Sequence, residues 1–209
     1  MPNYFSSKLI TPDEAVIEYV DIMGEGTPIL LIPGAGDGLN TVETFPYPTV
    51  LAWMFKRYAK DHRLIIMSRR EPVPSGFTVR DYAKDYVWAM NELKIDKAHI
   101  ETNSGGGPIG QWIAIDYPER VISLVLGETM AHVDQPFRKI LDEWVELCKN
   151  EQWYDFHVDS IVKTFTPNYY GKYKWAFPLM RLMPKPKYPE RMIRIFEGLL
   201  ELDNRPYLH

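Results

Sequence analysis

The chain has 209 residues, 45% of them hydrophobic and 13% aromatic, and a formal net charge of −4. This length predicts a single domain with a sizeable core, and the acidic balance disfavours a nucleic-acid-binding surface. The single cysteine, Cys148, excludes an internal disulfide, and its place in an apolar helical pattern indicates a packed thiol. Because we find neither a membrane-spanning apolar run nor a signal segment, we expect a cytoplasmic protein without membrane contact.

Five segments have the pattern of β-strands. Residues 15–22 alternate roughly between apolar and polar side chains. Four continuous apolar runs suit strands buried on both faces, at 28–32, 63–67, 98–101 and 122–126. Between these segments, apolar residues recur with helical spacing, at 49–59, 78–93 and 109–117. The alternation predicts an α/β fold, in which a mostly parallel sheet carries helices on both faces.

Two glycine-rich segments follow predicted strands, PGAGDG at 33–38 and NSGGG at 103–107. The second places Ser104 at a sharp strand-to-helix turn, close to the pattern G-x-S-x-G, with Thr102 in place of the first glycine. Ligands gather at the carboxyl ends of parallel strands, so the two segments together predict a site. An ordinary glycine-rich turn is the alternative interpretation.

Residues 134–203 contain no strand pattern and are rich in aromatic residues and methionine. Such a segment predicts a helical lid over the strand ends that encloses an apolar substrate pocket. Ordinary packing between helices is the alternative. The predicted organisation is a core at 1–133, a lid at 134–203 and the start of a return to the core at 204–209.

The order of these elements resembles the α/β-hydrolase family. The resemblance is carried by ILLIPGAGDG at 29–38, by the run from His99 to Leu126, and by DNRPYL at 203–208. It implies acyl transfer, in which Ser104 attacks an ester, thioester or amide carbonyl. The backbone N–H groups of Ala35 and Gly105 would then hold the oxyanion. Pro33 stands where the family usually has a histidine.

The family's catalytic acid and histidine normally follow two further strands after the lid, and we do not find them in this sequence. Some relatives carry the acid after the strand at 122–126, which makes Glu128 a candidate acid and His132 a candidate base. We expect His157 to be a lid residue and His209 a frayed one. Three explanations stay open: a fragment of a longer hydrolase, a short relative that kept only a binding pocket, or a second chain that supplies the missing strands.

The leading prediction is therefore a serine hydrolase whose small-molecule substrate has an apolar part. A lyase or cofactor-free oxygenase on the same scaffold, or a non-catalytic binding protein that uses the same pocket, is the alternative. A nucleotide site at 34–38 is disfavoured, because the spacing is not G-x-G-x-x-G and Ser68-Arg69-Arg70 ends the next strand. We predict no cofactor and no metal. The strand from Ile122 to Leu126 is expected at a sheet edge, where it would favour self-association.

Overall fold

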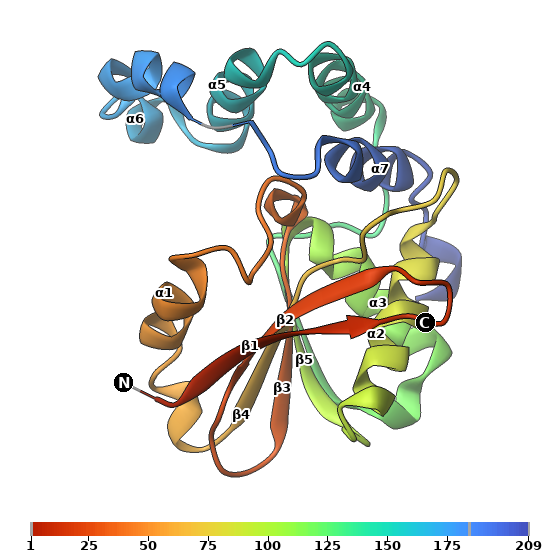
Figure 1. The fold of residues 1–209 in the computed structure, drawn as a ribbon. Helices are drawn as coiled ribbons and strands as arrows, with labels where there is room; N and C mark the ends of the chain where they lie inside the picture. Colours follow the sequence, from red (N-terminus) through yellow and green to blue (C-terminus); the bar gives the residue numbers. More distant parts are fainter. Residues whose placement is uncertain (1, 184, 209) are drawn as a thin grey trace.

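The computed structural model describes residues 2–183 and 185–208, so the expectation for His209 lies outside the described residues. A sheet layer comes first in the chain and a helical layer follows it (Figure 1). The strands are β1 (Tyr4–Ile10), β2 (Val16–Ile22), β3 (Pro28–Ile32), β4 (Arg63–Met67), β5 (Ala98–Asn103) and β6 (Val121–Gly127). The helices of the sheet layer are α1 (Tyr47–Met54), α2 (Val79–Glu92) and α3 (Gly107–Asp116).

The six strands lie in the order β1-β2-β4-β3-β5-β6. The pairs from β4 through β3 and β5 to β6 are parallel, whereas β2 is antiparallel to both β1 and β4. The predicted mostly parallel sheet is therefore confirmed. Because β3 and β5 are neighbours, their carboxyl ends place the two glycine-rich segments side by side.

Helices cover both faces of the sheet, as predicted. On one face, α2 and α3 pack in a large core that includes Tyr82, Tyr86 and Met90 from the predicted apolar side of α2. On the other face, a smaller core lies under α1. Helix α2 begins where expected because Thr78 and Asp81 form a capping box that satisfies its first amide groups. Helix α1 ends at Met54, short of the predicted range.

Strand β6 differs from the prediction of a buried run. In this strand the side chains of Ile122, Val125 and Leu126 are 43%, 55% and 44% exposed. In the described residues, β6 pairs only with β5, so it forms the expected edge of the sheet. An apolar strand sequence indicates an interior position, but burial depends on the neighbouring strand and not on the strand alone.

Strand β1 was not predicted. Its sequence, YFSSKLI, breaks the alternation with two adjacent serines, and Ile10 at its end is 70% exposed. The strand forms because all seven residues pair with β2. Within the glycine-rich segment at 33–38, Ala35–Gly38 forms a short 3-10 helix.

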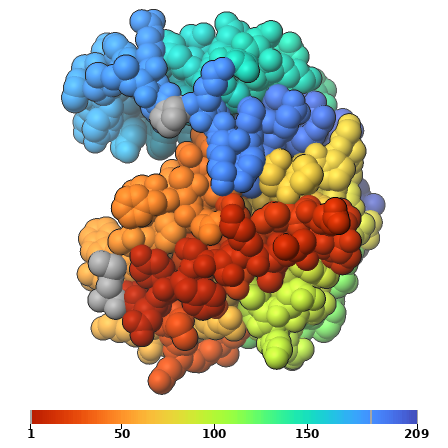
Figure 2. Space-filling view, in the orientation of Figure 1, coloured from red at the N-terminus to blue at the C-terminus, as the bar shows by residue number. Residues whose placement is uncertain are grey.

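We call residues 134–203 the cap segment. It contains α4 (Gln135–Lys149), α5 (Trp153–Thr164), α6 (Pro167–Tyr170), a 3-10 helix at Lys174–Leu182, and α7 (Pro189–Leu200). These helices lie above the loop that follows β3, and a notch separates their outer end from the α1 side of the sheet layer (Figure 2). Across the described residues, no helix is long and apolar enough to cross a bilayer.

The cap segment leaves and rejoins the sheet layer at one place, which we call the neck. There the amide of Asn204 donates to the carbonyl oxygen of Ala131 at 2.7 Å, and the amide of Val133 donates to the carbonyl oxygen of Leu202 at 3.3 Å. Within the cap segment, rings of α4, α5 and α7 pack together: those of Trp144 and Phe156 lie 5.5 and 5.9 Å from Phe196. Apolar contacts thus hold the cap helices to one another.

Candidate functional site

Ser104 lies between β5 and α3 with a φ of +49°, a conformation that non-glycine residues rarely adopt. The predicted sharp turn at this serine is therefore present. It needs small neighbours, because a Cβ atom on Gly106 would lie 2.5 Å from the carbonyl oxygen of Ile32 and 2.7 Å from that of Pro33. Such a strained serine is characteristic of functional positions.

The two glycine-rich segments touch at this turn. A Cβ atom on Gly34 would lie 3.2 Å from the Cβ atom of Ser104. A Cβ atom on Gly105 would lie 3.4 Å from the amide nitrogen of Ala35. The structure thus brings Ser104 together with both residues whose amides the sequence suggested as oxyanion donors.

A buried arginine forms hydrogen bonds with both glycine-rich segments. Arg69 donates from Nη1 to the carbonyl oxygen of Gly34 at 3.0 Å and from Nη2 to that of Gly105 at 2.9 Å. Its side chain is 1% exposed. Sequence reasoning used Arg69 only as evidence against a nucleotide site and missed this role. No local pattern signals this role, because the partners of Arg69 lie about 35 residues away along the chain.

Asp37 in turn holds Arg69 in place. Its Oδ2 atom accepts a hydrogen bond from the backbone amide of Arg69 at 2.8 Å and lies 3.5 Å from Arg69 Nη1. The other oxygen of Asp37, Oδ1, lies 3.1 Å from Nη2 of Arg191 in α7. Arg191 Nη1 also donates to the carbonyl oxygen of Arg69 at 3.1 Å. One buried carboxylate therefore connects the loop after β3, the loop after β4 and the cap segment.

Thr129 supports the serine turn from the β6 side. Its hydroxyl donates to the carbonyl oxygen of Ser104 at 2.7 Å. The side chain packs directly on the start of α3, because a Cβ atom on Gly107 would lie only 2.0 Å from Thr129 Oγ1 and 2.4 Å from its Cβ. The third glycine of the segment is therefore required by this contact.

A pocket of about 600 Å³ lies between the two glycine-rich segments and the cap segment. Its sheet-layer lining includes Ala35, Asn103, Ser104 and Glu128. The cap segment contributes mainly apolar side chains, with a few polar ones: Phe137, Ile140, Trp144, Phe156, Ser160, Lys163, Thr164, Phe165, Met192 and Phe196. The arrangement places the serine and the two glycine-rich segments beside a mainly apolar chamber, which suits binding of a molecule with an apolar part.

The structure separates the candidate acid and base. Glu128, with a φ of +46°, lines the pocket together with Ser104. His132 lies at the neck instead, with its Nδ1 atom 3.9 Å from Asp203 Oδ2. In the described part of the chain, no histidine is among the residues that line this pocket.

Two further histidines lie away from Ser104. His62 and His99 lie at the opposite end of the sheet, with their ring centroids 5.7 Å apart, and both form a hydrogen bond with Thr27. His157 is buried in α5, and this burial lowers its pKa. Cys148 is buried in α4, which raises its thiol pKa to about 12 and fits the predicted packed role.

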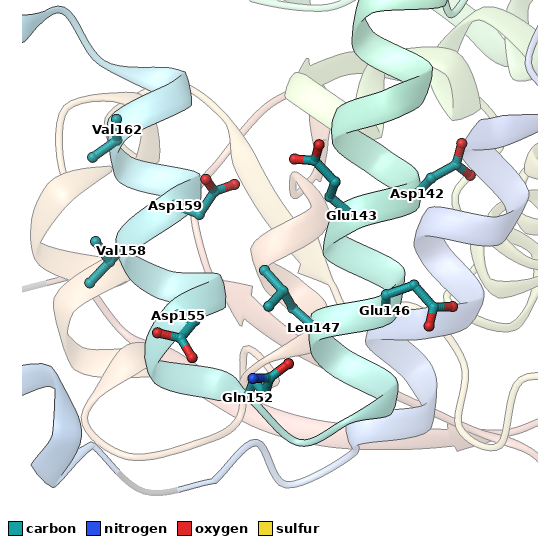
Figure 3. Close-up of a pocket in the computed structure, with 9 residues that line it drawn as sticks. All are labelled: Asp142, Glu143, Glu146, Leu147, Gln152, Asp155, Val158, Asp159 and Val162. Atoms are coloured by element: carbon teal, nitrogen blue, oxygen red, sulfur yellow. The ribbon is translucent and has the colours of Figure 1, made fainter.

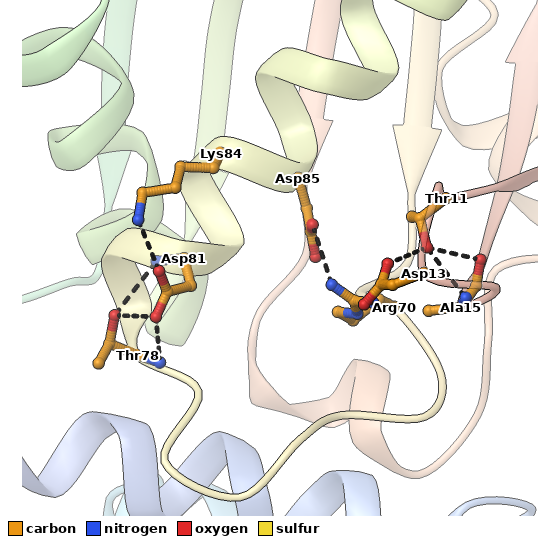
Figure 4. A network of polar contacts seen from close by, with 8 residues as sticks. All are labelled: Thr11, Asp13, Ala15, Arg70, Thr78, Asp81, Lys84 and Asp85. Carbon is orange, nitrogen blue, oxygen red and sulfur yellow. Dashed lines mark hydrogen bonds and ion pairs between the residues drawn. The ribbon is translucent and has the colours of Figure 1, made fainter.

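Two polar features lie outside the pocket. A groove of about 720 Å³ between α4 and α5 is lined by five carboxylates together with Leu147, Val158 and Val162 (Figure 3). Near the turn after β1, Arg70 contacts both Asp13 and Asp85 (Figure 4). Among the described residues, no group of three metal-ligating side chains lies close enough together to hold a metal ion.

Comparisons with known proteins identify similar chains. A family model described as "alpha/beta hydrolase fold" matches residues 27–152. The chain is 32% identical over 121 residues to "Uncharacterized hydrolase YcgS" of Bacillus subtilis (strain 168), which covers 56% of this chain and 39% of that protein. It is 32% identical over 124 residues to "Putative carbamate hydrolase RutD" of Azorhizobium caulinodans, which covers 59% and 45%.

A solved structure shows the same fold over most of this chain. MGS-M2, an alpha/beta hydrolase enzyme from a Medee basin deep-sea metagenome library, superposes with a TM-score of 0.80 at 18% identity, covering 97% of this chain and 74% of that one. At this identity the likeness concerns the fold alone. The alignments with YcgS and RutD span less than half the length of those two proteins.

Proposed function

The chain belongs to the alpha/beta hydrolase fold family, and on this premise we propose that it is a serine hydrolase acting on an ester or related acyl carbonyl compound. The observation that carries the proposal is the position of Ser104, on a strained turn at the floor of the pocket and beside Ala35 and Gly105. Ester, carbamate and lactone carbonyls share one need, a nucleophile next to donors for the developing oxyanion.

In the proposed reaction, the Oγ atom of Ser104 attacks the carbonyl carbon, and the amides of Ala35 and Gly105 donate to the oxygen that becomes negative. A serine hydroxyl is a weak nucleophile unless a base accepts its proton. Glu128 is the carboxylate that lines the pocket with Ser104, so we assign the proton to Glu128 in this chain. His132, the other candidate, would have to move from the neck to take part.

We propose that the cap segment acts as a lid that selects the substrate. Its contribution to the pocket is mainly aromatic and aliphatic, which favours an apolar acyl or alcohol part. The few polar lining groups, among them Asn103 and Lys163, are available to contact a carbonyl or a heteroatom. The compartment proposed for this chemistry is the cytoplasm.

The test is intact-mass measurement after incubation with a fluorophosphonate, which phosphonylates activated serines. We expect one adduct on the wild-type chain, loss of the adduct in Ser104→Ala, and an unchanged adduct in Ser160→Ala. Ser160 is a matched control because it lines the same pocket from α5. Glu128→Gln should slow labelling more than His132→Asn if Glu128 accepts the proton. Folded wild-type protein that forms no adduct would overturn the proposal.

The second candidate is a binding protein that uses the pocket without catalysis. It is favoured by one observation: no histidine lines the pocket among the residues that the structure describes. This function predicts that apolar esters bind and quench the fluorescence of Trp144 without being hydrolysed, in wild type and Ser104→Ala alike. Hydrolysis that depends on Ser104 would exclude it.

We also propose that β6 pairs with a second copy of this chain, because its exposed apolar side chains line a sheet edge. Sedimentation velocity at tens of micromolar should then show a species larger than a monomer. Val125→Lys should restore the monomer, since Val125 is 55% exposed and the lysine can be accommodated. Ile10→Lys, on the opposite edge strand and 70% exposed, is the matched control. A wild-type chain that stays strictly monomeric would refute this pairing.

A further inference from the structure

Each amide assigned to the oxyanion belongs to a peptide group whose carbonyl oxygen is hydrogen-bonded by a side chain. The N–H of Ala35 shares its peptide plane with the carbonyl of Gly34, which accepts from Arg69 Nη1 at 3.0 Å. The N–H of Gly105 shares its plane with the carbonyl of Ser104, which accepts from Thr129 Oγ1 at 2.7 Å. Two unrelated side chains thus serve the same purpose at the two predicted donors.

Such a bond has two physical effects on the donor. It fixes the peptide plane, and therefore the direction in which the N–H points. It also polarises the amide, because hydrogen bonds in a chain strengthen one another. Both effects matter most where charge develops during a reaction, since donors that are already oriented cost no reorganisation.

We propose that Arg69 and Thr129 are positioning residues that orient and polarise the oxyanion donors Ala35 and Gly105. This inference rests on the proposed function and adds two residues, Arg69 and Thr129, to the proposed site. Arg69 suits the role because its guanidinium is fixed by Asp37 and its second nitrogen also holds the carbonyl of Gly105.

Thr129 suits the role because its side chain is confined. It packs against the start of α3 and fills the space that a Cβ atom on Gly107 would occupy. Arg69 also places a planar cation where lysine would be inadequate, since one ammonium on a flexible stem does not bridge two carbonyl groups in fixed geometry.

The test compares Thr129→Val, which keeps the shape and removes the hydroxyl, with Thr129→Ser, which keeps the hydroxyl. Thr11→Val is the matched control, because it removes a buried hydroxyl that bonds the backbone of the turn after β1, away from the pocket. Two quantities are measured: the second-order rate of labelling by the fluorophosphonate, and the ¹H–¹⁵N chemical shifts of the Ala35 and Gly105 amides.

We expect Thr129→Val to slow labelling about three- to tenfold, the usual value of one neutral hydrogen bond. The Gly105 amide proton should move upfield while that of Ala35 stays in place. Thr129→Ser should recover both readouts, and Thr11→Val should change neither. In Arg69→Lys the Ala35 amide should shift as well. Should the Arg69 variant not fold, the Thr129 pair still decides the matter.

The two proposals can fail separately. If wild-type protein is not labelled, the proposed function fails, and the amide shifts alone test the positioning role. Unchanged shifts of Gly105 in Thr129→Val would refute positioning, whatever the labelling rate. A shift without any loss of labelling rate in an active chain would also refute it, because the polarised donor would then have no effect on the reaction.

Discussion

The floor and the roof of the pocket are held in place by different kinds of interaction. The floor is formed by residues 33–38 and 103–107, whose backbone groups are fixed by Arg69, Asp37 and Thr129. The roof is the cap segment, whose helices pack through aromatic and aliphatic side chains. Polar contacts of fixed geometry suit a region that must place atoms precisely, whereas apolar packing tolerates changes of shape.

This difference suggests a division of roles. The floor carries the proposed chemistry, so a small displacement there should be costly. The proposed role of the roof is to select the shape of the apolar substrate part, and the roof meets the floor through Arg191 of α7, which lies 3.1 Å from Asp37 Oδ1. Substitutions that affect the two regions unequally can test this division, as follows.

The largest effect is expected from Asp37→Asn. It leaves the buried guanidinium groups of Arg69 and Arg191 without a counter-charge, which should lower the free energy of unfolding by about 3–5 kcal/mol. Glu143→Gln in the roof also breaks an ion pair, with Lys163, but Glu143 is 61% exposed, so its cost should stay below about 1 kcal/mol. Urea unfolding measures both, and equal losses would contradict the distinction.

A smaller effect is expected from Gly106→Ala. The added Cβ atom would collide with the carbonyl oxygens of Ile32 and Pro33, which should cost about 1–3 kcal/mol of stability and slow any reaction at Ser104. Gly36→Ala, in the other half of the floor, is the control, since nothing lies within 4 Å of its added Cβ. Its stability should stay within about 0.5 kcal/mol of wild type in the same urea titration.

The last effect concerns pH and the contacts of Arg70 with Asp13 and Asp85 near the turn after β1 (Figure 4). Burial raises the pKa of Asp85 from 3.8 to about 6, despite the nearby Arg70. Between about pH 4 and pH 6, the Asp85 carboxyl is therefore protonated in the folded chain and ionised in the unfolded chain. The resulting stabilisation is complete below about pH 4 and is lost as the pH rises through about 6.

Asp85→Asn should remove that dependence. Its free energy of unfolding should fall less than that of wild type between pH 4 and 7, by about 2 kcal/mol. Thermal or urea unfolding at several pH values measures the difference. Parallel curves for the two proteins would show that Asp85 ionises normally in the folded chain.

Much of the sheet could be predicted because its strands carry their own signal. The segments that became β2 to β6 are apolar or alternating, and the glycines beside Ser104 mark a place where backbones approach closely. Strand β1 was missed because its pairing with β2, rather than its own pattern, makes it a strand. The exposure of β6 was missed for the corresponding reason: burial depends on what lies beside a strand.

The candidate site divides in the same way. Ser104, Ala35 and Gly105 could be proposed because a local motif contains them. Arg69 could not, since an arginine after a strand usually marks a solvated loop. Its burial depends on Asp37, 32 residues earlier, and on Arg191, 122 residues later, and no local pattern reports such contacts.

The neck has a consequence for how this architecture can diversify. The two backbone hydrogen bonds that join residues 131–133 to 202–204 mean that the cap segment begins and ends at a single point. Closing such an insertion costs little more when it is lengthened, and the strand register is not affected by its content. The helices that line the pocket can therefore vary in length and sequence, provided that α7 keeps Arg191, which contacts Asp37 and the carbonyl oxygen of Arg69.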